Sequence, residues 1–132
     1  MTLLDTNAII WFFTLNGRLG RRAYEMITTA RRRGEAAFSA MSIWEIGMLL
    51  QKGRISRNRT VTQWHERLLA EGFHEIPVTG VIAARAGDLP DMHGDPADRI
   101  VVATALEGHL LVTSDAPILN WPHRLDRFPA TR

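Results

Sequence analysis

The sequence predicts one α/β domain over residues 1–132, with helices packed on a central parallel β-sheet. Short apolar segments alternate along the chain with longer segments that have helical spacing. The apolar run Leu110–Thr113 has the composition of a strand that is buried on both faces, which is typical of parallel sheets. No repeat, low-complexity stretch or linker divides the chain.

The expected strands are short, because each apolar segment is only a few residues long. Leu3–Asp5 opens the chain and ends at an acid. Ala36–Ser39 and Leu110–Thr113 are the other clear strand segments. Weaker candidates are Phe73–Pro77 and the segment near Leu125–Phe128.

Five helices are expected between these strands, and a glycine or a proline marks the end of each. Glycine ends many helices because it adopts the left-handed conformation readily. The predicted helices are Tyr24–Arg33, Ser42–Lys52, Val61–Glu71, Val81–Asp88 and Pro96–Glu107. The residues that end them are, in the same order, Gly34, Gly53, Gly72, Pro90 and Gly108.

Several classes of protein are excluded by what the chain lacks. It contains no cysteine, which excludes disulfides, a thiol nucleophile and metal sites with cysteine ligands. Its longest apolar run, Ala8–Phe13, is far shorter than the ~20 residues that cross a membrane. The N-terminus has no basic stretch, so we expect no signal peptide and a cytoplasmic protein. The histidines have no metal-ligand spacing, and there is no glycine-rich phosphate loop.

The basic residues favour a nucleic-acid partner. Of the 16 basic residues, Lys52 is the only lysine, and arginine binds phosphate in a bidentate manner. If four of the 14 acids hold cations, the rest of the surface is basic and attracts nucleic acid. Arg54, Arg57 and Arg59 lie in one predicted loop, where a solvated loop and a nucleic-acid contact fit equally well.

Four carboxylates are expected at one edge of the sheet, where parallel sheets bind ligands at the carboxyl ends of their strands. Asp5 ends the first strand, and Asp115 follows Leu110–Thr113. Glu45 and Asp98 lie in helices that begin at the same edge. Gathered carboxylates repel one another, and a divalent cation removes that repulsion. Mg²⁺ prefers such oxygen ligands and can activate water for attack at phosphorus.

Each of these acids also has an ordinary structural explanation. Asp5 and Asp115 are suited to cap helices, and Asp95 with Asp98 fits a capped helix start. Glu45 is harder to explain, because three of its four neighbours one turn away are apolar and place it on the buried side of its helix. Either an arginine or a cation would satisfy a buried glutamate.

The aromatic and triple-arginine clusters are also explained by structure alone. Arg31–Arg33 precede Gly34 at a helix C-terminus, where cations are favourable. The aromatic residues that we expect in the core or on a partner surface, rather than stacked on bases, are Trp11, Phe12, Phe13, Trp44 and Trp64.

Four segments in series resemble the PIN-domain nucleases, and closely the VapC-like toxins of bacterial toxin–antitoxin pairs. They are Leu3–Asn7, Ser39–Ile46, Asp95–Ala105 and Leu110–Asp115. The resemblance implies a single-domain α/β/α sandwich with a central parallel β-sheet. It also implies Mg²⁺- or Mn²⁺-dependent endoribonuclease activity on RNA. As partners it implies a cognate antitoxin that fills a groove at the active site, and a second toxin copy in a homodimer.

The resemblance places the catalytic and metal-binding quartet on Asp5, Glu45, Asp98 and Asp115. We expect the first three to hold the principal ion, and Asp115 to close the site or support a second ion. The residues expected to orient carboxylates or waters are Thr6, Asn7 and Ser114. The candidates for phosphate contacts are Arg54, Arg57, Arg59 and Arg99.

Two other functions compete with this interpretation. A non-catalytic module of the same fold would bind RNA or an antitoxin without cleavage, but the complete acidic quartet argues against it. A phosphate enzyme of the haloacid dehalogenase or receiver type needs a lysine after a later strand, whereas Lys52 lies at the end of a predicted helix.

Overall fold

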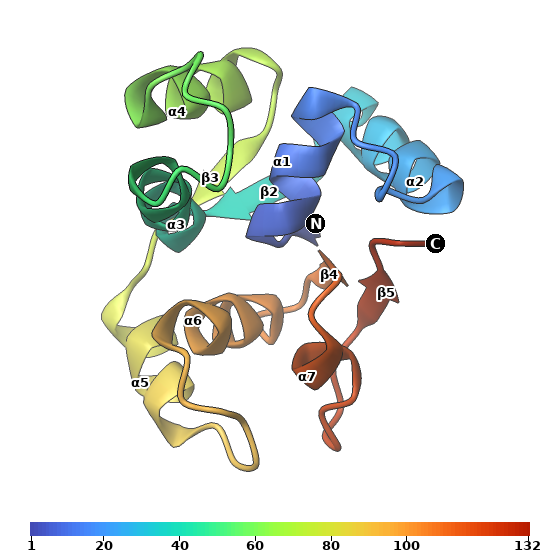
Figure 1. Ribbon diagram of the computed structural model, residues 1–132. Helices are drawn as coiled ribbons and strands as arrows, with labels where there is room; N and C mark the ends of the chain where they lie inside the picture. Colours follow the sequence, from blue (N-terminus) through green and yellow to red (C-terminus); the bar gives the residue numbers. More distant parts are fainter.

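The computed structural model describes residues 1–132 and contains one five-stranded sheet between two layers of helices (Figure 1). The strands are β1 (Thr2–Leu4), β2 (Ala36–Ser39), β3 (His74–Ile76), β4 (Leu110–Thr113) and β5 (Arg127–Pro129). They pair in the order β3-β2-β1-β4-β5, and every neighbouring pair is parallel. The predicted α/β/α sandwich is therefore confirmed.

The hydrophobic core has two parts, one on each face of the sheet, because successive side chains of a strand point to opposite faces. Leu3 pairs with Leu111, and both belong to one buried cluster. Leu4 pairs with Val112, and both belong to the other cluster. Burial on both faces explains why these strands are continuously apolar in the sequence.

Helices cover both faces of the sheet. The face that carries Leu4 is covered by α1 (Thr6–Thr14), α2 (Arg21–Arg32), α3 (Ala40–Gln51) and α4 (Val61–Ala70). The opposite face is covered by α6 (Pro96–Ala105) and α7 (Ala116–Leu119), and α5 (Gly80–Asp88) packs against α6. Figure 1 shows these two layers on either side of the sheet. None of the helices combines the length and the apolar character that a membrane span requires.

The sequence pattern did not predict α1 or α7. The apolar residues Ala8–Phe12 of α1 are buried at five successive positions, so the helix lacks the polar face that marks an amphipathic helix. The short helix α7 has four residues. The other five helices were predicted with small errors at their ends: α2 begins at Arg21 rather than Tyr24, and α6 ends at Ala105 rather than Glu107.

The predicted signals at the helix ends are confirmed. The glycines after four helices adopt positive φ, as expected for residues that end a helix; they are Gly34, Gly53, Gly72 and Gly108. Asp95 caps α6, because its carboxylate accepts a hydrogen bond from the Asp98 amide at 2.9 Å. Pro96 follows in the first turn, where its missing N–H costs nothing.

The neighbouring strands β1 and β4 create the crevice of this fold. The chain moves outward from β1 through β2 to β3, and then returns to β4 on the other side of β1. Open parallel sheets bind ligands at such a reversal, beyond the carboxyl ends of the strands. The Asp5 amide donates to the Val112 carbonyl there at 2.9 Å, which holds the end of β1 against β4.

Arg99 in α6 fastens the loop that leads into this edge. Its guanidinium donates at 2.8–3.3 Å to the backbone carbonyls of Ala86, Gly87, Leu89, Met92 and His93. An arginine side chain has five N–H donors, so these carbonyls take up its donor capacity. This geometry contradicts the expectation that Arg99 contacts phosphate.

We therefore predict that Arg99→Met lowers the free energy of unfolding by about 2–4 kcal/mol, because the loop carbonyls lose their charged donor. Urea denaturation measures the change. Arg32→Met is the matched control, since Arg32 is an exposed helical arginine whose side chain makes no hydrogen bond; its effect should stay within about 0.5 kcal/mol. Equal urea midpoints for Arg99→Met and the parent would rule out the fastening role.

Candidate active site

The four acids that the sequence singles out meet at the carboxyl edge of the sheet. Asp5 follows β1 and Asp115 follows β4. Asp98 lies in the first turn of α6, and Glu45 lies in α3, directly after β2. Their proximity is visible in their electrostatics, because the charges of Asp5, Asp115 and Glu45 all act to raise the pKa of Asp98. Asp95 adds a fifth negative charge to the group.

Asp5 is the most buried of the four, with 6% of its surface exposed. Its carboxylate accepts hydrogen bonds from the Thr6 amide at 2.8 Å and from the Thr113 hydroxyl at 2.7 Å. Burial raises the pKa of Asp5 above its usual value, although these two hydrogen bonds act in the opposite direction. The carboxylate is therefore held in a fixed orientation, in surroundings that disfavour its charge.

Thr113 connects two of the acids through its hydroxyl group. The Thr113 oxygen also accepts a hydrogen bond from the Asp115 amide at 3.1 Å, so a single hydroxyl links the residues after β1 and β4. The side chain of Ser114 makes no hydrogen bond to another residue, and its role in orienting carboxylates or waters stays a prediction. Asn7 is exposed and likewise makes no side-chain hydrogen bond.

Glu45 is held by hydroxyl groups and has no arginine partner. The Thr6 hydroxyl donates to its carboxylate, as expected for Thr6, and Thr6 Oγ1 lies 3.0 Å from Ser42 Oγ. Burial is the main cause that raises the pKa of Glu45 from 4.5 to about 7, and the charge of Asp5 contributes to the rise. The sequence left either an arginine or a cation as the partner of Glu45, and the structure shows that it is not an arginine.

The pKa of Asp98 is raised further than that of Glu45. Burial, followed by the charges of Asp5 and Asp115, raises the pKa of Asp98 from 3.8 to about 8. No lysine or arginine forms an ion pair with any member of the quartet. The site thus gathers carboxyl groups whose charged forms no lysine or arginine side chain stabilises.

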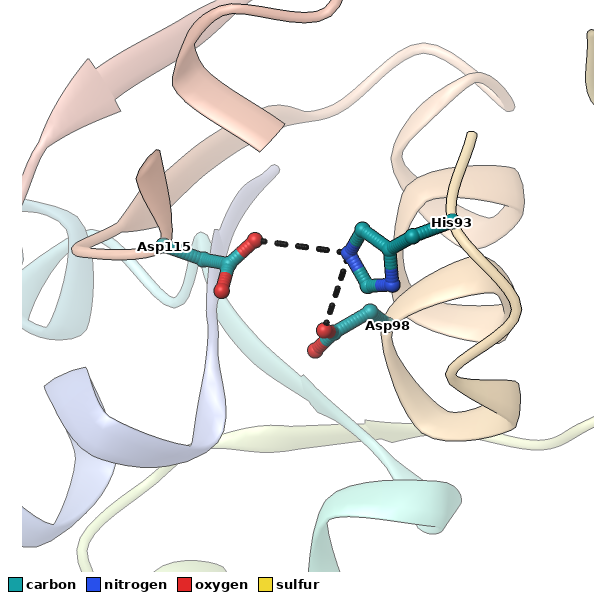
Figure 2. Close-up of side chains that lie close together, drawn as sticks. All are labelled: His93, Asp98 and Asp115. Atoms are coloured by element: carbon teal, nitrogen blue, oxygen red, sulfur yellow. Dashed lines mark ion pairs between the residues drawn. The ribbon is translucent and has the colours of Figure 1, made fainter. Parts of the chain in front are cut away.

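His93 also belongs to this site, and the sequence interpretation missed it. Its Nε2 atom lies 3.3 Å from Asp98 Oδ2 and 3.7 Å from Asp115 Oδ2 (Figure 2). The Asp95 amide donates to His93 Nδ1 at 3.3 Å, so in the neutral ring the proton is on Nε2, facing the two carboxylates. The spacing between histidines does not reveal His93, because its neighbours in the site are aspartates. The loop before α6 brings His93 close to them.

The three arginines of the loop after α3 differ in what they contact. Arg57 donates to the carbonyls of Leu50 and Gln51 at the end of α3, and Arg59 lies over the Trp64 ring at 5.2 Å. Arg54 alone has no side-chain partner, and it lines a cavity together with Glu45. Of the arginines proposed for RNA, Arg54 is therefore the one best placed.

The donor chemistry of the site fits a divalent cation. Asp5, Glu45, Asp98 and Asp115 offer hard oxygen ligands of the kind that Mg²⁺ and Mn²⁺ accept. The ligand atoms of His93, Asp98 and Asp115 lie within 4.8 Å of one another, close enough to share one ion. A cation would supply the positive charge that the surrounding side chains do not.

Comparison with known proteins gives a consistent result. The family model of the PIN domain matches residues 2–120. Ribonuclease VapC22 of Mycobacterium tuberculosis is 36% identical over 123 residues, which cover 92% of each protein. A chain from a toxin–antitoxin complex of Klebsiella pneumoniae has the same fold, with a TM-score of 0.64, 22% identity and 98% of each chain covered. The chain belongs to the PIN-domain family, and within it is similar to the VapC ribonucleases.

Proposed function

We propose that this protein is a metal-dependent endoribonuclease that acts as the toxin of a toxin–antitoxin pair. The observation that carries the proposal is a set of buried and half-buried carboxylates without a lysine or arginine partner, at the edge of the sheet where ligands bind. The name of its relative, a VapC ribonuclease, supports the choice of RNA as substrate. The toxin–antitoxin complex that shares its fold supports the assignment to a toxin.

The residues that would hold the ion are the acidic quartet. Asp5, Glu45 and Asp98 would bind the principal Mg²⁺ or Mn²⁺, and Asp115 would close the site or support a second ion. When bound, the cation supplies positive charge that stabilises the phosphate in the transition state and makes water a better nucleophile.

Neighbouring side chains prepare the quartet for this task. Thr113 and Thr6 hold the carboxylates of Asp5 and Glu45 in one orientation through hydroxyl hydrogen bonds. His93 places its Nε2 atom 3.3 Å from Asp98 and 3.7 Å from Asp115, where it would join them in holding the ion. Arg54 is placed to bind an RNA phosphate at the rim of the site.

The partners of the protein follow from the proposed toxin role. A cognate antitoxin would block the acidic site and keep the nuclease inactive, and the toxin would form a homodimer and a larger assembly with it. The activity would be exercised in the cytoplasm, where cellular RNA is found.

The first test is cleavage of total bacterial RNA by the purified, antitoxin-free protein. We expect discrete fragments with Mg²⁺ or Mn²⁺ and none with EDTA. Asp98→Asn should lower the initial rate by at least about 100-fold, because a ligand worth several kcal/mol in the transition state is lost. Gel electrophoresis of the RNA over time gives the rates.

The matched control for this test is Asp88→Asn, at an exposed aspartate near the end of α5 that forms no ion pair. It should cleave at the parent rate. If folded Asp98→Asn retains parent activity, the assignment of the site fails. If the parent binds RNA but cleaves none with either metal, a binding module of the same fold is the better explanation.

A second prediction concerns the pH dependence of stability in EDTA. The folded protein holds the carboxyl protons of Glu45 and Asp98 up to pH values of about 7 and about 8, whereas the unfolded chain releases them near 4.5 and 3.8. The folded state therefore binds more protons than the unfolded chain over this window, so its stability falls as pH rises from about 4 to about 8. We expect the melting temperature to fall likewise.

Asp98→Asn isolates the contribution of the site from that of other titrating groups. It should melt a few degrees above the parent at pH 8 in EDTA, and its melting temperature should fall less between pH 5 and pH 8. Differential scanning calorimetry with Asp88→Asn alongside measures both effects. Identical pH dependence in Asp98→Asn and the parent would show that repulsion at this site does not limit stability.

A further inference from the structure

The cavity lined by Arg54 and Glu45 opens directly beside the acidic site. Its volume is about 320 Å³, and it lies between α3 and the N-terminus of α6. Glu45 and Asp95 form the end that adjoins the site, Lys52 and Arg54 stand at the other end, and Trp44 and Met48 also line the cavity. Glu45 therefore belongs to both the cavity and the site.

Trp44 is exposed in a way that the other tryptophans are not. Trp64 and Trp121 are 3% and 4% exposed, whereas 59% of Trp44 is exposed. Trp44 makes no hydrogen bond and contacts no other aromatic ring. Of the aromatic residues expected in the core or on a partner surface, Trp11, Phe12 and Trp64 lie in the core, whereas Trp44 lies on the surface. A large indole face is thus left open beside the acids.

Charge changes sign along the cavity. The carboxylates of Glu45 and Asp95 stand at one end, and the cations of Lys52 and Arg54 stand at the other. Neither Lys52 nor Arg54 forms an ion pair, so both charges are free for a ligand. Glu45 lies in α3 and Lys52 caps its C-terminus seven residues later, which separates their backbones by about 10 Å along the helix.

We propose that this cavity binds one nucleotide of single-stranded RNA next to the phosphodiester bond that is cut. The base stacks on the indole of Trp44 beside the Met48 side chain, and Lys52 and Arg54 bind the phosphate of that nucleotide. This inference rests on the function proposed for the acidic site. It adds a subsite that holds the RNA strand and gives Trp44 a specific role in positioning it.

The features of the cavity favour RNA over a peptide. An aromatic platform next to free cations is the usual arrangement for binding single-stranded nucleic acid, since every base has a flat face and every nucleotide carries a negative charge. A basic antitoxin segment would be attracted to the acids but repelled by Lys52 and Arg54. A second copy of the chain remains an outcome of the test.

The binding test uses Asp98→Asn as a common background, so that RNA is not cut during the measurement. The probe is a short single-stranded RNA of mixed sequence, labelled with fluorescein, and anisotropy gives the dissociation constant at low salt. Adding Trp44→Ala should weaken binding about 10- to 100-fold, whereas Trp44→Phe should retain most of it. Tyr24→Ala removes another exposed aromatic residue, far from the cavity on α2, and should leave binding unchanged.

Tryptophan fluorescence reports on Trp44 directly, because the other tryptophans are buried. Unlabelled RNA should quench the tryptophan fluorescence of the Asp98→Asn protein. This quenching should be absent when Trp44→Phe is added. Lys52→Ala should reduce the salt dependence of binding, because one phosphate contact is lost. Unchanged RNA affinity in Trp44→Ala, or the absence of quenching, would overturn the proposal.

Two further outcomes separate this inference from the proposed function. If the single variant Trp44→Ala, which retains Asp98, cleaves RNA with unchanged kcat/KM, the subsite is refuted while the nuclease stands. If RNA quenches Trp44 but the parent cleaves nothing, the nuclease fails while the binding site stands. Loss of the dimer in Trp44→Ala with normal RNA binding, measured by size-exclusion chromatography, would assign the surface to a second copy and refute the subsite.

Discussion

Burial of neighbouring carboxyl groups at one edge of the sheet is the constraint on which the acidic site depends. Burial disfavours the charges of Asp5, Glu45 and Asp98, acidic neighbours add to the effect, and no lysine or arginine pairs with these three groups. Such an arrangement survives only where the rest of the chain is rigid enough to impose it. The rigidity comes from the central strands, which are buried on both faces, and from the hydroxyl and amide groups that hold each carboxylate.

The same aspartates cap helices and belong to the acidic site. Asp5 begins α1 by accepting a hydrogen bond from the Thr6 amide, and Asp115 begins α7 by accepting one from Ile118. From the sequence, capping and a role in the site look like alternatives. In the structure they are compatible, because a cap needs only one carboxylate oxygen to accept a backbone hydrogen bond. The helix that begins at the acid also directs its partial positive N-terminal charge toward it.

Sequence reasoning was accurate where local chemistry decides the structure. The glycines that end helices and the acids after β1 and β4 could be identified because each obeys a rule that involves only its neighbours in the chain. Prediction from the sequence failed where contacts between distant parts of the chain decide the structure. Helix α1 was missed because it is surrounded by the core, and the proximity of His93 to Asp98 depends on a loop held by Arg99. The exposure of Trp44 depends on how α3 and α6 are spaced, which no local pattern encodes.

The hydrogen bond between Thr113 and Asp5 joins residues that are 108 positions apart in the chain. During synthesis on the ribosome, Asp5 is made long before the strand that supplies Thr113 and Asp115. Contacts of such long sequence separation form late, because the intervening chain must first be brought together. A nascent chain therefore carries an unfinished acidic site until β4 has been made. Any chemistry that needs all four carboxylates becomes possible only after that point.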